Sequence, residues 1–192
     1  MTVLSQHTSD LNTARAFEGL KSRWPSWQAV VDAPVEEVAI SIRSGGLADS
    51  KAPRIQSILR QIEEREGDFD LRRLDELPDE EVVDYLCSLP GVGPKTAACV
   101  LLFSMERNAF PVDTHVHRVA MRLGLIPPKT PAGRAQLLLT EGIAPELRYE
   151  FHMQLIRHGR EVCKAGRPRC SDCVLFDLCE SGPLLLAAGS AR

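Results

Sequence analysis

The sequence is poor in aromatic residues and contains no long apolar run. Its 192 residues include six Phe, two Trp and two Tyr, and this low content favours helices because aromatic residues are enriched in strands. No apolar stretch approaches the ~18 residues of a membrane-spanning helix. Residues 1–7 lack the basic and apolar regions of a secretory signal. We therefore expect a cytoplasmic protein with no membrane partner.

Composition and charge place the chain among ordinary globular proteins. Hydrophobic residues make up 44% and charged residues 26%, which argues against disorder, collagen and coiled coil. The net charge of −3 is uneven, because residues 61–84 carry eleven acids and three arginines, whereas residues 148–169 carry six bases and two acids. We interpret the acidic stretch as a solvated helix face. A net charge near neutrality still allows a polyanionic partner.

Apolar residues recur at helical spacing along nearly the whole chain, and no segment alternates with period two, so we predict an all-α protein. In the first predicted helix, residues 9–24, the apolar positions run from Leu11 to Leu20 in three-residue steps. A helix over 51–65 should end at Gly67. Residues 181–188 either fray or lay three leucines on the body. Further helices are predicted over residues 79–89, 94–106, 113–123, 131–142 and 145–162.

A short hairpin connects two of these helices at residues 89–97. Gly91 and Gly93 can adopt a positive φ and allow another backbone to approach closely. Pro94 suits the first position of the following helix, where its missing N–H has no partner in any case. Amides and a helix N-terminus that point outward form a natural phosphate site. The alternative is an ordinary turn between two helices.

Lys95 and Asp113 carry the side chains in this part of the chain that are suited to catalysis. Lys95 lies at the second position of its helix, where the positive end of the dipole disfavours an ammonium and favours the neutral amine that nucleophilic attack requires. Alternatively, Lys95 only reaches the same phosphate. Asp113 precedes a helical run, so an N-cap role competes with a functional one. His115 and His117 face different sides of that helix and cannot form a compact metal pair.

Four of the six cysteines form a closing cluster, Cys163-x6-Cys170-x2-Cys173-x5-Cys179. Clustered cysteines in a chain without a signal peptide indicate metal ligands rather than disulfides. Only one short pair is present, which fits a cubane iron–sulfur cluster better than zinc, although zinc remains the alternative. Cys87 and Cys99 lie on apolar stripes, and we expect buried thiols. The loop after Cys163 carries three bases and suits a phosphate clamp.

The hairpin Leu-Pro-Gly-Val-Gly-Pro-Lys-Thr-Ala, the Val-Asp-Thr-His segment and the cysteine pattern together resemble the endonuclease III type of helix-hairpin-helix DNA glycosylase. The resemblance covers essentially the whole chain. It implies a six-helix barrel domain, residues 1–107, and a helical [4Fe-4S] cluster domain, residues 108–192. It also implies that Lys95 is the nucleophile and that Asp113 assists it. The expected partner is double-stranded DNA with a damaged base or an abasic site, bound by a monomer that is nucleoid-associated in a bacterium.

The resemblance extends to a loop that inserts a leucine into the duplex. Residues 46–52 match its Gly-Leu-x-x-x-Lys-Ala pattern, so Leu47 is the candidate wedge, with a core leucine as the alternative. His7 takes the place of the glutamine that fills the space left by the flipped base, and Gln6 is the other candidate. The full set of expected DNA contacts is Gln6, His7, Asp10, Leu47, Gly91, Val92, Gly93, His115, Lys164, Arg167 and Arg169.

The expected activity is base excision by a bifunctional glycosylase that removes oxidised pyrimidines and cleaves the abasic site by β-elimination. A monofunctional glycosylase of the same fold and a non-catalytic module that binds damaged DNA are the alternatives. His7, and Ala48 where the family often has an aromatic residue, depart from the family pattern and bear on lesion preference. Relatives also carry a further helix and a half before the first segment, so either the true start lies upstream or the site is more open.

Overall fold

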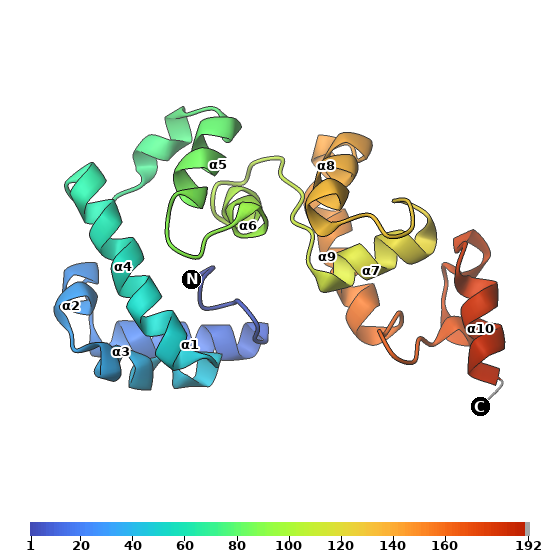
Figure 1. Cartoon of the computed structure of the whole chain (residues 1–192), viewed down its shortest axis with the longest axis horizontal. Helices are drawn as coiled ribbons and strands as arrows, with labels where there is room; N and C mark the ends of the chain where they lie inside the picture. Colours follow the sequence, from blue (N-terminus) through green and yellow to red (C-terminus); the bar gives the residue numbers. More distant parts are fainter. Residues whose placement is uncertain (191–192) are drawn as a thin grey trace. The chain divides into compact units, whose positions relative to one another are not determined.

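The computed structural model describes residues 1–190 and the side chains of residues 1–188, and this part of the chain contains helices and no strand (Figure 1). The all-α prediction is confirmed. No helix within it is both long and apolar enough to span a membrane. The chain divides into two compact units, Met1–Ala97 and Ala98–Arg192. The division falls inside one helix, N-terminal to the boundary predicted between residues 107 and 108.

The first unit is built around its longest helix. This helix, α4 (Ala48–Glu66), packs against α2 (Trp27–Asp32) and α3 (Val35–Ser41), and α3 in turn packs against α1 (Asp10–Arg23). The helix α5 (Asp79–Cys87) precedes the hairpin, and α6 (Pro94–Ser104) follows it. The core of buried side chains draws on α1 to α4, so these helices form the base on which the N-terminal segment and the loop before α4 are mounted.

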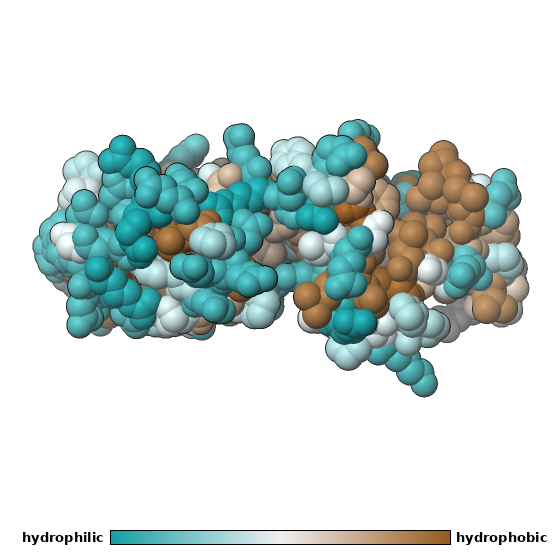
Figure 2. Space-filling view, turned by 90° about the horizontal axis from the view of Figure 1, so that it is seen from above, coloured by the Kyte–Doolittle hydropathy of each residue, from teal (hydrophilic) through white to brown (hydrophobic). Residues whose placement is uncertain are grey.

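The second unit contains α7 (Thr114–Leu123), α8 (Ala132–Gly142), α9 (Arg148–Glu161) and α10 (Gly182–Ser190). Helices α7 and α9 pack against each other, and α10 packs against the two short 3-10 turns at Cys170–Asp172 and Phe176–Leu178. Its core has buried side chains such as Phe110, Val119 and Leu155. The unit exposes Val174, Leu178 and Leu184, and Figure 2 shows large hydrophobic areas on its surface.

Several predicted helices match within a few residues, and the differences have local causes. Helix α4 starts at Ala48 rather than Lys51, and Gly67 ends it in the left-handed conformation, with φ +82°. The buried stripe of α1 is Thr13, Ala16 and Leu20, whereas Leu11 is exposed. Of the four apolar positions that repeat at three-residue steps, only Leu20 belongs to the buried stripe.

The chain end and the isolated cysteines also differ from expectation. Residues 182–190 form the helix α10 instead of fraying. Its three leucines do not all pack on the body, since Leu184 and Leu186 are exposed and only Leu185 is half-buried. Cys99 is buried, as predicted, but Cys87 is only half-buried.

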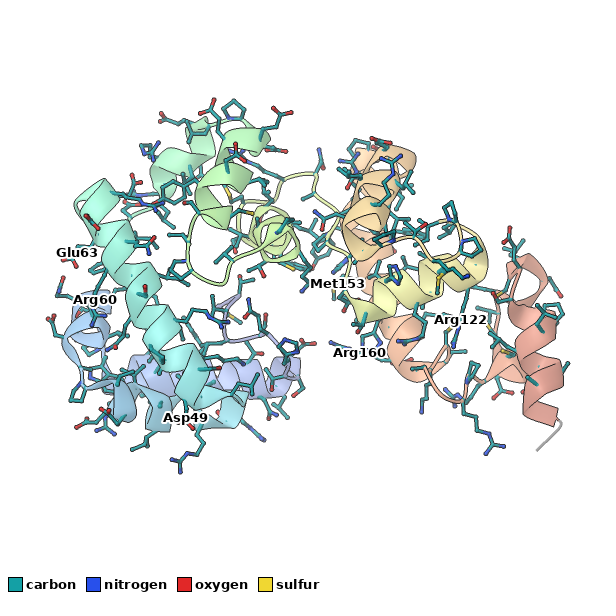
Figure 3. The ribbon with its side chains drawn as sticks, in the orientation of Figure 1. Asp49, Arg60, Glu63, Arg122, Met153 and Arg160 are labelled. Carbon is teal, nitrogen blue, oxygen red and sulfur yellow. The ribbon has the colours of Figure 1, made fainter. Side chains whose placement is uncertain are left out.

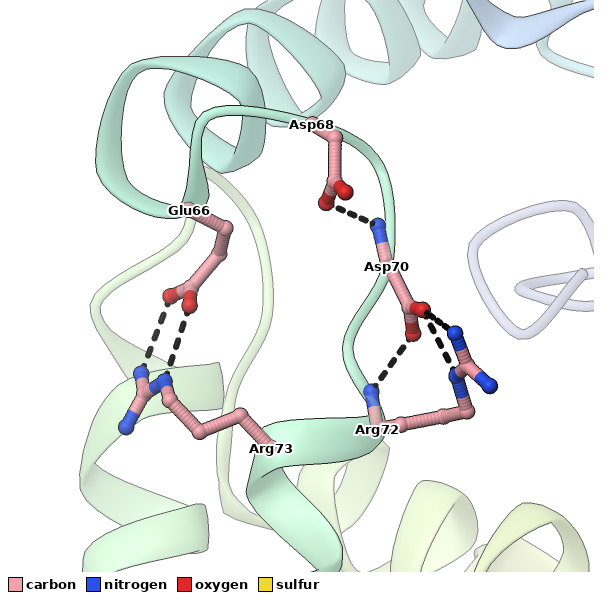
Figure 4. A network of polar contacts seen from close by, with 5 residues as sticks. All are labelled: Glu66, Asp68, Asp70, Arg72 and Arg73. Carbon is pink, nitrogen blue, oxygen red and sulfur yellow. Dashed lines mark hydrogen bonds and ion pairs between the residues drawn. The ribbon is translucent and has the colours of Figure 1, made fainter.

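The acidic stretch between α4 and α5 neutralises part of its own charge (Figure 4). Arg73 donates two hydrogen bonds of 2.9 Å to the Glu66 carboxylate, and Arg72 pairs with Asp70. Hydrogen bonding to Arg73 lowers the pKa of Glu66. The Asp68 carboxylate accepts from the Asp70 backbone N–H at 2.8 Å. The stretch is thus a turn with internal ion pairs as well as a solvated helix face.

Candidate functional site

The hairpin between α5 and α6 has two glycines with different roles. Gly91 has φ +71°, and a Cβ placed there would lie 2.6 Å from Cδ and Nε of Arg54. Gly93 does not share the positive φ, and a Cβ there would meet no atom within 4 Å. Its carbonyl accepts from the Ala97 backbone N–H at 2.9 Å, which starts α6. Gly91 therefore makes the turn, and Gly93 leaves space for a ligand to approach the backbone. Val92, between them, is half-buried.

Lys95 is exposed at the second position of α6. The neighbouring Thr96 is buried and joins the core side of the helix. The N-terminal amides of a helix carry a partial positive charge that attracts phosphate. An amine at this position, beside an open glycine, is accessible to a ligand that approaches the hairpin.

Gln6 attaches the N-terminal segment to the hairpin. Its Nε2 donates to the Gly91 carbonyl and to Thr96 Oγ1, both at 3.3 Å, and its Oε1 accepts from Nη1 of Arg54 at 3.2 Å. His7, in contrast, is exposed with φ +56°. Of the two candidates for the filling residue, Gln6 is thus engaged by the protein and His7 is presented to solvent. Asp10, the first residue of α1, is also exposed.

Leu47 occupies a left-handed position directly before α4. Its φ is +51° and its ψ is +34°, and the side chain is 59% exposed. The alternative of a core leucine is therefore wrong. Side chains rarely adopt this backbone region because the Cβ crowds the following carbonyl. An exposed leucine in a disfavoured conformation is consistent with a residue that is held ready for a ligand.

The sequence analysis placed Lys51 in the Gly-Leu-x-x-x-Lys-Ala match but assigned it no role, and the structure buries it at the fourth residue of α4. Its side chain is 1% exposed, and its ammonium donates to the carbonyls of Leu4 and Gly45, each at 2.8 Å. Burial lowers the pKa of Lys51, and the charge of Arg54 lowers it further. The available signal was the position of Lys51 beside the apolar stripe that contains Ile55, Leu59 and Ile62.

In the second unit, Asp113 is the N-cap of α7, as predicted. Its Oδ1 accepts from the Val116 backbone N–H at 2.7 Å. The two histidines of α7 have separate partners, because His115 Nδ1 lies 3.1 Å from Nη2 of Arg118 and His117 Nε2 lies 2.7 Å from the Thr130 carbonyl. The two imidazoles therefore contact different parts of the second unit.

Arg118 connects this helix start to the cysteine segment. Besides the contact with His115, its guanidinium donates to the carbonyl of Cys163 at 2.9 Å and to that of Gly159 at 2.8 Å. His115 is half-buried, and a Cβ at Gly159 would lie 2.9 Å from the His115 Cβ. Close packing against α9 therefore fixes the side chain that was predicted to touch DNA.

The four clustered cysteines line one pocket. Apolar side chains including Val119, Phe176 and Leu185 form much of its wall. Burial raises the pKa of the Cys170 thiol, and the three neighbouring cysteines raise it further. Within residues 1–190, no three His, Cys, Asp or Glu side chains converge on a point suited to a single metal ion. A cubane iron–sulfur cluster takes four thiolates, and the number of thiols around this pocket equals that number.

Arg122, near the end of α7 (Figure 3), supports the cysteine loop. Its Nη1 donates to Sγ of Cys163 at 3.3 Å and to the Lys164 carbonyl at 2.9 Å, and its Nη2 donates to the Ala165 carbonyl at 3.1 Å. Its own carbonyl accepts from the Cys179 thiol at 3.2 Å. Arg122 therefore holds the backbone of the cysteine loop, and one of its sulfur atoms, from the side of α7.

The basic loop keeps its three cationic side chains exposed. Lys164 and Arg167 extend from the loop, whereas Arg169 also donates to the Glu161 carbonyl at the end of α9, at 2.7 Å. Arg122 fixes the loop backbone from the other side. A rigid backbone with exposed cations suits contact with phosphate.

Comparisons with known proteins agree with this arrangement. Residues 1–145 match the model for the HhH-GPD superfamily base excision DNA repair protein. Endonuclease III of Thermotoga maritima is 36% identical over 180 residues, which cover 93% of this chain and 79% of that protein. The DNA glycosylase/AP lyase ROS1 of Arabidopsis thaliana is 34% identical over 190 residues, covering 86% of this chain and 14% of that protein.

Structural comparison gives the same result. The structure of a non-covalent Endonuclease III–DNA complex matches with a TM-score of 0.83 and 31% identity, and covers 96% of this chain and 82% of that chain. The helices and the hairpin thus define a protein of the helix-hairpin-helix class. The chain belongs to the HhH-GPD superfamily of base excision DNA repair proteins, which confirms the resemblance seen in the sequence. It spans 14% of the length of ROS1 and 55% of another Arabidopsis thaliana relative.

Proposed function

We propose that this protein is a bifunctional DNA glycosylase and abasic-site lyase that acts on oxidised pyrimidines in double-stranded DNA. One observation carries the proposal. Lys95 is an exposed amine on the first turn of α6, directly after a hairpin in which Gly91 makes the turn and Gly93 leaves open space. An amine beside a phosphate site is placed to attack the sugar attached to that phosphate. The similarity to Endonuclease III and to a DNA glycosylase/AP lyase supports the same activity.

The reaction follows from the chemistry of a neutral amine. The target nucleotide leaves the stack because its sugar carbon cannot be reached inside the duplex. The Lys95 Nζ lone pair forms a bond to C1′, and the damaged base departs with the electrons of the glycosidic bond and is protonated. Opening of the sugar gives a Schiff base, and loss of a C2′ proton then expels the 3′ phosphate. The resemblance assigns to Asp113 the carboxylate that stabilises the cationic sugar or accepts the lysine proton.

DNA contacts are assigned by exposure and charge. The open hairpin at Gly93 and the start of α6 bind phosphate, and the cations of the basic loop add attraction that depends on salt. Leu47 and His7 fill the space vacated by the target base, which also bends the duplex. His115, which lies near the start of α7 and contacts Arg118, is a further proposed DNA contact. We propose that the enzyme binds as a monomer.

The cysteine pocket fits a [4Fe-4S] cluster held by Cys163, Cys170, Cys173 and Cys179. When bound, such a cluster crosslinks the loops and can exchange electrons, but the residues here point to a structural use. Arg122 and Arg118 tie the cysteine loop to α7, so a cluster in the pocket would fix the backbone that presents Lys164 and Arg167. Iron and sulfide near four of each per chain would support the cluster, whereas zinc alone would contradict it.

Activity on two duplexes tests the proposal. One carries thymine glycol and the other a preformed abasic site, and base release and strand cutting are measured separately. We expect wild-type protein to cut both and Lys95→Gln to cut neither while it still binds. Lys129→Gln, at an exposed lysine outside the proposed site, should behave as wild type. Base release without cutting would instead indicate a monofunctional glycosylase, and binding without either reaction would indicate a non-catalytic module.

A further inference from the structure

The first unit holds a buried charge that the proposed chemistry does not use. The Lys51 ammonium contacts two backbone carbonyls rather than a carboxylate, those of Leu4 and Gly45. Moving an ammonium out of water is unfavourable unless it is well hydrogen-bonded. Buried ionic groups are weak evidence for stability, because apolar residues often replace them without loss. The role of Lys51 is therefore indicated by the two segments to which these carbonyls belong, and not by the buried charge alone.

Each of these carbonyls lies just before an exposed residue with left-handed backbone. Leu4 precedes His7 by three residues, with φ +56° at His7, and Gly45 precedes Leu47 by two residues, with φ +51° at Leu47. Disfavoured backbone conformations persist only where the surroundings fix them. One ammonium thus joins the two segments that present these side chains. Asp49, labelled in Figure 3, lies in the first turn of α4, which also contains Lys51.

We propose that Lys51 is a positioning residue that holds Leu47 and His7 at a fixed spacing, so that both enter the duplex as the target base leaves it. This inference rests on the proposed function. A base must be unstacked before excision, whereas an abasic site has no base to remove from the stack. Lys51 is therefore required for removal of a base and much less for cutting at a preformed abasic site.

The same helix provides a matched control. Gln56, 3% exposed, also donates from α4 to backbone carbonyls, those of Val30 at 2.9 Å and Ala33 at 2.7 Å. These carbonyls belong to the α2 region, which carries neither Leu47 nor His7. Replacing either residue by Met removes the donor and leaves a side chain of similar length. If Lys51 served stability alone, both variants would lower both activities in proportion to their loss of folded protein.

The experiment compares the wild-type protein, Lys51→Met and Gln56→Met. Single-turnover removal of thymine glycol is measured beside cutting at a preformed abasic site, with 2-aminopurine fluorescence next to a non-cleavable abasic analogue as a report of insertion. We expect Lys51→Met to lose about tenfold or more in base removal, to keep abasic cutting within about threefold, and to give a weaker fluorescence change. Gln56→Met should leave the ratio of the two activities as in wild type.

The outcomes separate this inference from the proposed function. If Lys51→Met left the ratio of base removal to abasic cutting as in wild type, the positioning role would be overturned. If wild-type protein processed neither duplex, the proposed function would fail instead. Should Lys51→Met not fold in a thermal melt, Lys51→Gln, which keeps one donor group, takes its place with the same expected change in ratio.

Discussion

Leu47 gives the sharpest test of how the structure relates backbone strain to function. The residue has φ +51° and is 59% exposed, so about two-fifths of its side chain is buried. Glycine adopts this backbone region without steric cost. The substitution Leu47→Gly therefore removes the exposed side chain and the strain together.

The stability change is a balance of three contributions. Relief of the left-handed conformation stabilises the folded chain by about 1–2 kcal/mol. Loss of two-fifths of a leucine contact costs roughly 0.6–1.2 kcal/mol, from the ~1.5–3 kcal/mol of full burial. The added freedom of glycine in the unfolded chain costs about 0.4–1 kcal/mol. The contributions nearly cancel, so we expect the free energy of unfolding to stay within about 0.5 kcal/mol of wild type.

Leu11 is the matched control in the same unit. It is 61% exposed but belongs to α1, where its backbone is helical. Leu11→Gly loses a similar contact and adds the penalty of glycine in a helix, about 1 kcal/mol, with no strain to relieve. Its expected loss is roughly 1.6–2.2 kcal/mol. Urea unfolding of both variants, with the slope checked against wild type, measures the difference.

The functional result should be the reverse of the stability result. Leu47→Gly is expected to lose removal of thymine glycol because no wedge enters the duplex, whereas Leu11→Gly keeps it wherever the protein is folded. Equal destabilisation of the two variants would refute the argument from strain. Unimpaired base removal by Leu47→Gly would refute the role of Leu47 as the wedge.

Three further predictions concern the hairpin, the helix cap and the cysteine loop. Gly91→Ala should destabilise the protein by about 1–2 kcal/mol because of its positive φ and the Arg54 contact, whereas Gly93→Ala should melt as wild type yet bind duplex more weakly in a fluorescence titration. Asp113→Asn keeps an acceptor for the Val116 N–H and should cost little stability, whereas Asp113→Ala should cost about 1 kcal/mol. Both variants should lose strand cutting. If Asp113→Asn stayed active, the role of Asp113 would be limited to the helix cap. Arg122→Leu removes the donors to Cys163 and to the loop carbonyls, so iron per chain should fall faster than in wild type during incubation with a chelator, and equal retention would contradict the supporting role.

The sequence predicted those features that depend on residues close together in the chain. Gly67 as the end of α4, Asp113 as a cap and the hairpin before Pro94 each follow from local backbone chemistry. The common site of the cysteines follows from their spacing. In α1, the three-residue series of apolar positions did not identify the buried stripe, to which only Leu20 of that series belongs.

The missed residues depend on partners far away along the chain. Lys51 contacts a carbonyl 47 residues earlier. Gln6 was a candidate DNA contact, but its bond to the hairpin 85 residues later was not predicted. Arg122 reaches the loop carbonyl of a residue 42 positions on. A window of sequence shows that Lys51 lies beside an apolar stripe, but it does not show which carbonyls of distant segments come close enough to accept from its ammonium.

Covalent trapping tests the central claim most directly. Wild-type protein is incubated with an abasic duplex and borohydride, which reduces a Schiff base to a stable amine, and the crosslinked peptide is then identified by mass spectrometry. We expect one adduct, on the peptide that contains Lys95, and none with Lys95→Gln. An adduct at another lysine, or an undiminished adduct in Lys95→Gln, would contradict this expectation.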